Sequence, residues 1–309
     1  MREGIENIPA NLAEIEEYMI CDKSEIVKNI LSSSKCYFYD CSAFRNHMKN
    51  SGRQFILQYI KKTQGIVILI KSVLMELCTE KGELWEEHIE YIKEMKRVGL
   101  LVFIINEEDV VEVLQNCFSS VKMINMWLSY AVKNVKSKYG AMELTLRNDL
   151  LLKQELLVNY NEQDRFLGRR FFEKMRREWK MEANLGEEMI AVCLHMLSHI
   201  PEYTSYKYIA LTDDKGAVRL IGKVMEYINK MQGQKNLSAL TSASLCQRML
   251  RCGILMTEEQ IRKIVEGEKG LERISVYCSG EYELYPDIVT MTSREFAEKV
   301  VKNEITVYM

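Results

Sequence analysis

The sequence predicts an α/β protein with a mainly parallel sheet flanked by helices. Short apolar runs typical of buried strands recur along the chain, and a segment with helical periodicity follows each of them. Alternation of this kind favours parallel strands joined by helical crossovers. At 309 residues and 47% hydrophobic, the chain is long enough for one large domain or two ordinary ones.

The apolar runs give the positions of the predicted strands. They are CYFYD, GIVILI, LLVFII and YKYIAL, at residues 36–40, 65–70, 100–105 and 206–211. A weaker strand is expected at 237–240, with helices near 215–231, 242–253 and 257–267. The third and fourth runs are separated by a long segment of helical periodicity that exceeds a single crossover helix. We interpret its central part, about 107–182, as a helical insertion.

Three regions follow from this pattern. Residues 1–34 are expected to form an N-terminal helical segment, residues 35–268 the main domain with its insertion, and residues 269–309 a C-terminal β-rich extension. The extension alternates like strands around a Ser-Gly turn, with a helical stretch, SREFAEKVVKN, before its end. It is either a small appended β element or a set of edge strands that completes the main sheet.

Composition narrows the class of protein. The 42 basic residues against 44 acidic ones give a net charge of -2, so a nucleic-acid contact would have to be local. Nine cysteines without a CxxC pair argue against a disulfide framework and a zinc knuckle, which favours the cytoplasm. The acidic amino terminus lacks a signal-peptide core, and no apolar run reaches the length of about 18 residues that spans a membrane.

Acidic residues follow several of the predicted elements. Each could simply cap a helix, but together they come from separate elements that meet at the carboxyl edge of a parallel sheet. Clustered carboxylates repel one another unless a cation binds them, and hard oxygen ligands select Mg²⁺ or Mn²⁺ over zinc. The predicted metal ligands are Asp40, Glu76, Glu187, Asp213 and Asp214.

The same residues carry a resemblance to the PIN-domain nucleases. YFYDCSAF, SVLMELC, LGEEMIAVCLHML, IALTDDKGAVRL and LSALTSASLCQRMLRCGIL are similar, in order, to motifs of that family, in the branch with Gly-Glu and Thr-Asp-Asp motifs. The resemblance implies a PIN-like fold for residues 35–268 and adds Ser42 and Thr212 as supporting hydroxyls. Glu188 competes with Glu187 as the third acid. The resemblance implies catalytic roles for Asp40, Glu76, Glu187 and Asp214.

The activity implied is a metal-dependent endoribonuclease acting on single-stranded or locally unpaired RNA, toxin-like or RNA-processing. The chain is longer than typical family members, and the insertion separates the second and third motifs. A noncatalytic PIN-like scaffold that binds nucleic acid or protein is therefore the alternative. An inhibitory protein partner and a homodimer are both left open, and no membrane association is expected.

Two further patterns have competing interpretations. DRFLGRRFFEKMRREWK, at 164–180, could grip phosphates through one helical face, or it could be an amphipathic helix with a solvated basic face. The candidate nucleic-acid-binding residues there are Arg165, Arg169, Arg176 and Lys180. His195 and His199 have a spacing that permits a shared metal, but an ordinary core or surface role is preferred because no third ligand is apparent.

Overall fold

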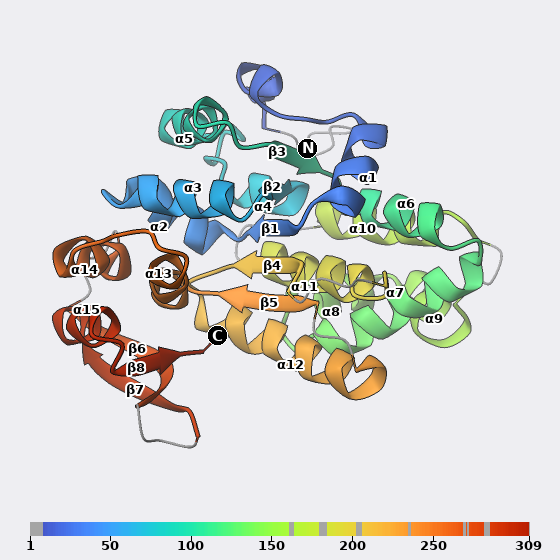
Figure 1. Ribbon diagram of the computed structural model, residues 1–309. Coiled ribbons are helices and arrows are strands. Elements are labelled where there is room, and N and C mark those ends of the chain that lie inside the picture. The colour runs from blue at the N-terminus through green and yellow to red at the C-terminus, as the bar shows by residue number, and fades with distance from the viewer. Residues whose placement is uncertain are drawn as a thin grey trace.

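A five-stranded parallel sheet forms the centre of the molecule, with strand order β3-β2-β1-β4-β5 (Figure 1). The computed structural model describes residues 9–160, 164–178, 184–201, 206–233, 236–267, 270, 272–280 and 285–308. The strands are β1 (Lys35–Tyr39), β2 (Gly65–Ile70), β3 (Val102–Ile105), β4 (Tyr208–Leu211) and β5 (Leu237–Leu240). The predicted α/β class and the five strand positions are confirmed, with boundaries shifted by two residues or fewer.

The strand order reverses between β1 and β4. From β1 the chain passes to β2 and β3 on one side of the sheet, and from β4 to β5 on the other. Tyr39 at the end of β1 pairs with Leu211 at the end of β4, and the Asp40 N–H donates to the Leu211 carbonyl at 2.9 Å. The carboxyl ends of these two strands therefore lie side by side at a reversal point, the place where open α/β sheets form ligand crevices.

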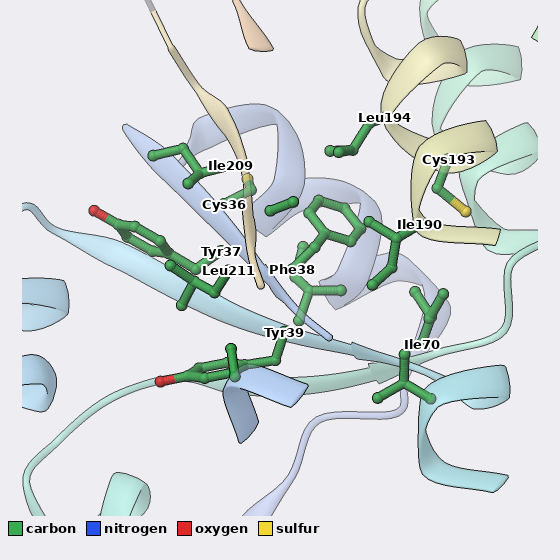
Figure 2. Close-up of a cluster of buried hydrophobic side chains, with 14 of the residues drawn as sticks. Cys36, Tyr37, Phe38, Tyr39, Ile70, Ile190, Cys193, Leu194, Ile209 and Leu211 are labelled. Carbon is green, nitrogen blue, oxygen red and sulfur yellow. The ribbon is translucent and has the colours of Figure 1, made fainter. Parts of the chain in front are cut away.

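Strand β1 is buried on both faces, as expected for the centre of a parallel sheet. Figure 2 shows Phe38 on the same side of the sheet as Ile190 and Leu194 of α11 (Leu185–Leu197), with Tyr37 and Tyr39 on the opposite side. Side chains alternate in this way because successive residues of a strand point to opposite faces. The two helical layers are therefore in contact with alternate residues of one strand.

Helices connect the strands and cover the faces of the sheet. Besides α11 they are α1 (Lys23–Ser32), α2 (Cys41–Lys49), α3 (Arg53–Lys62), α4 (Lys71–Glu76), α5 (Glu86–Arg97), α12 (Lys215–Gln232) and α13 (Ser242–Arg251). Helices α2, α4, α12 and α13 begin within four residues of the end of a strand. Two short 3-10 turns, η1 (Leu12–Glu14) and η2 (Glu16–Tyr18), precede α1. None of the helices in the described part of the chain has the length and apolarity needed to cross a bilayer.

All the regular elements in the described part of the predicted insertion are helices. They are α6 (Asp109–Cys117), α7 (Val121–Val135), α8 (Ala141–Asn148), α9 (Leu150–Gln154), the π-helical turn η3 (Glu155–Asn159) and α10 (Leu167–Glu178). Helices α6, α7 and α8 contact α11, which is consequently enclosed between the insertion and the sheet. This enclosure explains why α11 is apolar on nearly every side after its first turn.

A buried ion-pair network joins the insertion to the sheet. Arg176 of α10 forms ion pairs with Glu107 and with Glu108, and its two terminal nitrogens donate to the Glu108 carboxylate at 2.8 and 2.9 Å. Glu107 is fully buried and also accepts the Ser72 N–H at 2.7 Å, in the first turn of α4. The insertion therefore helps to fix the helix that ends at Glu76.

The C-terminal residues form a separate antiparallel sheet with order β7-β6-β8. This settles the alternative in favour of a small appended β element, because none of these strands joins the main sheet. The strands of this sheet are β6 (Arg273–Gly280), β7 (Asp287–Thr292) and β8 (Ile305–Val307). Two helices of the same region are α14 (Glu258–Glu266), which precedes β6, and α15 (Ser293–Val301), which joins β7 to β8. Gln247 of α13 holds β8 in place: its amide donates to the Ile305 carbonyl at 2.6 Å and accepts the Val307 N–H at 2.8 Å.

Candidate metal centre

Asp40 lies at the end of β1 and caps the N-terminus of α2. Its Oδ2 accepts hydrogen bonds from the Ser42 hydroxyl at 2.6 Å and from the Thr212 hydroxyl at 2.9 Å. Burial raises the pKa of Asp40, and these two hydroxyls oppose that shift. The side chain is therefore oriented by the two residues that the sequence predicted as its supports.

Glu76 is the last residue of α4 and points to the first turn of α11. Its Oε1 accepts the Gly186 N–H at 2.7 Å, and its Oε2 accepts the Cys41 thiol at 3.1 Å. A Cβ on Gly186 would lie 2.9 Å from Glu76 Oε2, so a side chain at this position would displace the Glu76 carboxylate. Burial raises the pKa of Glu76, with Asp40 adding to the rise.

The adjacent residues Glu187 and Glu188 have different surroundings. Burial first, and then the charges of the neighbouring acids Asp214, Asp40 and Glu76, raise the pKa of Glu187 to about 8. Glu188 instead accepts the Met142 N–H of the insertion at 2.7 Å. Glu187 therefore lies among the other acids and Glu188 faces α8, which favours Glu187 as the third acid.

Asp214 caps the N-terminus of α12, and its Oδ1 accepts the N–H groups of Gly216 and Ala217 at 2.5 and 3.0 Å. A Cβ built on Gly216 would lie 2.8 Å from Asp214 Oδ1 and 3.8 Å from Glu187 Oε2, so both carboxylates border this glycine. The Thr212 hydroxyl accepts the Asp214 N–H at 3.1 Å while it donates to Asp40. Thr212 therefore connects the ends of β1 and β4.

The carboxylate of Asp213, the fifth predicted metal ligand, is turned toward the start of α13 and toward α2. Its Oδ1 accepts the Ser242 N–H at 2.7 Å, and its Oδ2 accepts the Ser242 hydroxyl at 2.6 Å and the Asn46 amide at 2.7 Å. Both oxygens therefore accept hydrogen bonds from the start of α13, and Oδ2 also accepts one from α2. The Ser242 hydroxyl also lies 3.1 Å from Nε2 of the buried His47. Asp213 thus links three elements and has a structural role.

Four acids from four elements remain at the carboxyl edge of the sheet, and we call them the site carboxylates: Asp40, Glu76, Glu187 and Asp214. Burial raises the pKa of three of them, and repulsion by neighbouring acids adds to the rise for Glu76 and Glu187, an effect that a divalent cation would oppose. Their all-oxygen donor set fits Mg²⁺ or Mn²⁺. Within the described ranges, no group of three or more His, Cys, Asp or Glu side chains is placed to hold a metal ion. Ion binding would therefore require the carboxylates to draw together.

Sequence reasoning missed two residues beside these acids. Arg45 is exposed on α2 and donates to the Glu76 carbonyl at 2.6 Å, which places a guanidinium next to the acidic edge. Cys41 is buried with its thiol against Glu76. Their position in the sequence hinted at a place near the site, since both follow Asp40 within the first turns of one helix. The sequence does not show which face of that helix meets α4, so neither residue could be assigned from it.

The basic helix predicted to grip nucleic acid does not present one continuous face. Arg165 and Arg169 are exposed, and Arg169 pairs with Glu173 at 2.7 Å. Arg176 is buried in its pairs with Glu107 and Glu108, so its assignment to a nucleic-acid surface is wrong. Lys180 lies outside the described residues.

The two histidines predicted to have an ordinary role lie among aromatic rings. His199 stacks on Trp127 with ring centroids 4.3 Å apart, and His195 lies against Tyr227 at 5.6 Å. Burial lowers the pKa of His195 to about 4 and that of His199 to about 3. Both are therefore neutral packing residues near neutral pH.

Comparison of the chain with protein-family models, with curated proteins and with solved structures finds no match.

Proposed function

We propose that the chain is a metal-dependent phosphodiester hydrolase that cleaves single-stranded or locally unpaired RNA. The observation that supports this most is the convergence of the four site carboxylates, from four separate elements, at the reversal point of a parallel sheet. Structural acids are usually paired with cations, yet here the principal neighbours of Glu187 are other acids. RNA as the substrate rests on the PIN-domain resemblance of the same residues.

The site carboxylates would hold one or two divalent ions. A bound Mg²⁺ or Mn²⁺ supplies an acidified water and neutralises charge on a phosphate oxygen. Ser42 and Thr212 keep Asp40 in one orientation, and the Gly186 N–H does the same for Glu76. Such positioning reduces the rearrangement needed when substrate binds. The exposed Arg45 guanidinium is placed to contact a phosphate oxygen.

Cleavage of a labelled single-stranded RNA in the presence of Mn²⁺ tests the proposal. Asp40→Asn should reduce the rate at least about 100-fold, because even partners of a metal ligand typically contribute 10–100-fold. Asp287→Asn is the matched control, since it removes one carboxylate from an exposed position on β7 and should leave the rate unchanged. Equal cleavage by wild type and Asp40→Asn would exclude the assigned site.

Metal binding separates the two adjacent glutamates. In calorimetry with Mn²⁺, Glu187→Gln should weaken binding strongly, whereas Glu188→Gln should retain it because Glu188 faces Met142. Circular dichroism establishes that both variants are folded. Equal Mn²⁺ affinities for the two variants would contradict the assignment of Glu187.

The second candidate is a noncatalytic scaffold for nucleic acid or protein. It is favoured by one observation, that no group of three or more His, Cys, Asp or Glu side chains in the described part of the chain is placed to hold a metal ion. An absence of Mn²⁺ binding by the wild-type chain, together with an absence of RNA cleavage, would support the scaffold over the hydrolase.

A further inference from the structure

The loop between α7 and α8 contacts the first turn of α11, the turn that carries Glu187. Glu188 accepts the Met142 N–H at 2.7 Å, and a Cβ on Gly140 would lie 1.8 Å from Glu188 Oε1, so loop and carboxylate are in close contact. Glu188 is the neighbour of Glu187 in the first turn of α11. The loop is therefore anchored one residue away from a site carboxylate.

This part of the insertion is strongly basic in a chain of net charge -2. Residues 121–148 contain five lysines and arginines and one acid, Glu143. Glu143 pairs with Lys136 at 2.9 Å and with Arg147 at 3.2 Å, which holds these cations in place without neutralising them all. The Arg147 guanidinium also donates to the Lys138 carbonyl at 3.3 Å. The positive charge is thus concentrated on a fixed surface.

Aromatic rings are interleaved with these cations. Tyr139 is 76% exposed at the tip of the loop, and the Lys138 ammonium lies 5.2 Å from its ring centroid. The exposed Lys133 lies 5.8 and 5.7 Å from the ring centroids of Tyr130 and Tyr160. Cations that track a phosphate backbone and an exposed ring on which a base can stack are the two components of single-strand recognition.

We propose that this basic loop surface, formed by Lys133, Lys136, Lys138, Tyr139 and Arg147, binds the single-stranded nucleic acid whose phosphodiester enters the acidic edge. The inference rests on the proposed function and adds to it the surface that holds the substrate. Four carboxylates repel a polyanion, so attraction has to come from neighbouring cations. The basic loop surface would supply that attraction from the segment anchored to Glu188, and stacking on Tyr139 would make the recognition specific for unpaired bases.

Fluorescence anisotropy with a labelled oligouridylate of about 12 nucleotides, in EDTA, measures this binding without cleavage. Lys133→Ala/Lys138→Ala should weaken binding about 25-fold near 0.1 M salt and reduce the salt slope by about 1.4, since each single-strand phosphate contact contributes about 0.7. Tyr139→Ala should weaken binding about tenfold, and Tyr139→Phe should retain it because stacking needs the ring and not the hydroxyl.

The matched control is Lys62→Ala/Lys96→Ala. Both lysines are exposed near the ends of α3 and α5, which lead into β2 and β3, so they lie toward the opposite edge of the sheet. This variant should bind the oligouridylate like the wild type. Poly-glutamate serves as a competitor without bases and should displace the oligouridylate poorly.

The outcomes separate this inference from the proposed function. Wild-type affinity and salt slope in Lys133→Ala/Lys138→Ala would overturn the inference even if the protein cleaves RNA. Equal binding of poly-glutamate and oligouridylate, insensitive to Tyr139→Ala, would also overturn it and would indicate a surface for acidic proteins. Loop-dependent binding without Mn²⁺-dependent cleavage would support the surface and refute the hydrolase.

Discussion

Replacement of Arg176 by methionine tests the buried network between the insertion and the sheet. Arg176 is 4% exposed and its partner Glu107 is fully buried. Arg176→Met therefore leaves the carboxylates of Glu107 and Glu108 without the guanidinium that pairs with them. Removal of one partner from a buried ion pair costs about 3–5 kcal/mol. For a domain with an ordinary stability of about 5–15 kcal/mol, this is a large fraction of the free energy of unfolding.

Urea denaturation followed by circular dichroism measures the loss. Arg169→Met is the matched control on the same helix, because Arg169 also pairs with a glutamate, Glu173, but its side chain is 63% exposed. An exposed pair contributes about 0–1 kcal/mol. A loss in Arg176→Met within about 1 kcal/mol of that in Arg169→Met would refute the reasoning.

A second substitution separates charge from packing. In the Arg176→Met background, Glu107→Gln removes the unpaired buried charge, while the amide oxygen can still accept the Ser72 N–H. We expect part of the lost stability to return, because residues of one ion-pair network are energetically coupled. A further loss of stability on adding Glu107→Gln would show that the unpaired Glu107 carboxylate does not destabilise the Arg176→Met variant.

Two other predictions concern pH and the C-terminal element. Burial lowers the pKa of His47 to about 4, and the charge of Asp213 opposes this shift. Below the ordinary histidine pKa of about 6.5 the unfolded chain therefore binds more protons than the folded chain, so the free energy of unfolding decreases as the pH falls. His47→Gln should reduce the slope of unfolding free energy between pH 4.5 and 6 by up to about 1.4 kcal/mol per pH unit in urea titrations; an unchanged slope would contradict burial of a neutral ring. Gln247→Leu should leave the Ile305 carbonyl and Val307 N–H unpaired, at about 1–3 kcal/mol each, and should accelerate hydrogen exchange at Val307. Unaltered exchange there would show that β8 does not depend on the Gln247 amide.

The main sheet could be predicted because each strand is a short apolar run that the fold buries on both faces. GIVILI is fully buried from Gly65 to Ile70, and periodicity together with length is enough to find such a segment. The alternation of apolar and polar residues predicted the C-terminal strands. It did not predict whether they join the main sheet, since this depends on contacts such as those of Gln247 that no local sequence pattern records.

The site was predictable to the extent that sequence position determines location. Asp40 and Asp214 follow adjacent parallel strands, so their proximity is a consequence of topology. Asp213 could not be separated from Asp214 by position, because side-chain direction after a strand depends on which partner each carboxylate meets. The same limit applied to Arg176, whose basic sequence context gave no sign of the two glutamates that bury it.

The paired glutamates at the start of α11 constrain how this chain can change. Successive residues of a helix are turned by about 100°, which is why Glu187 meets the sheet acids while Glu188 meets the insertion. A deletion or duplication of one residue before them would turn both side chains by about 100° in the same sense, whereas a conservative substitution would alter one contact alone. We therefore expect the first turn of α11 to tolerate replacement far better than any change of length.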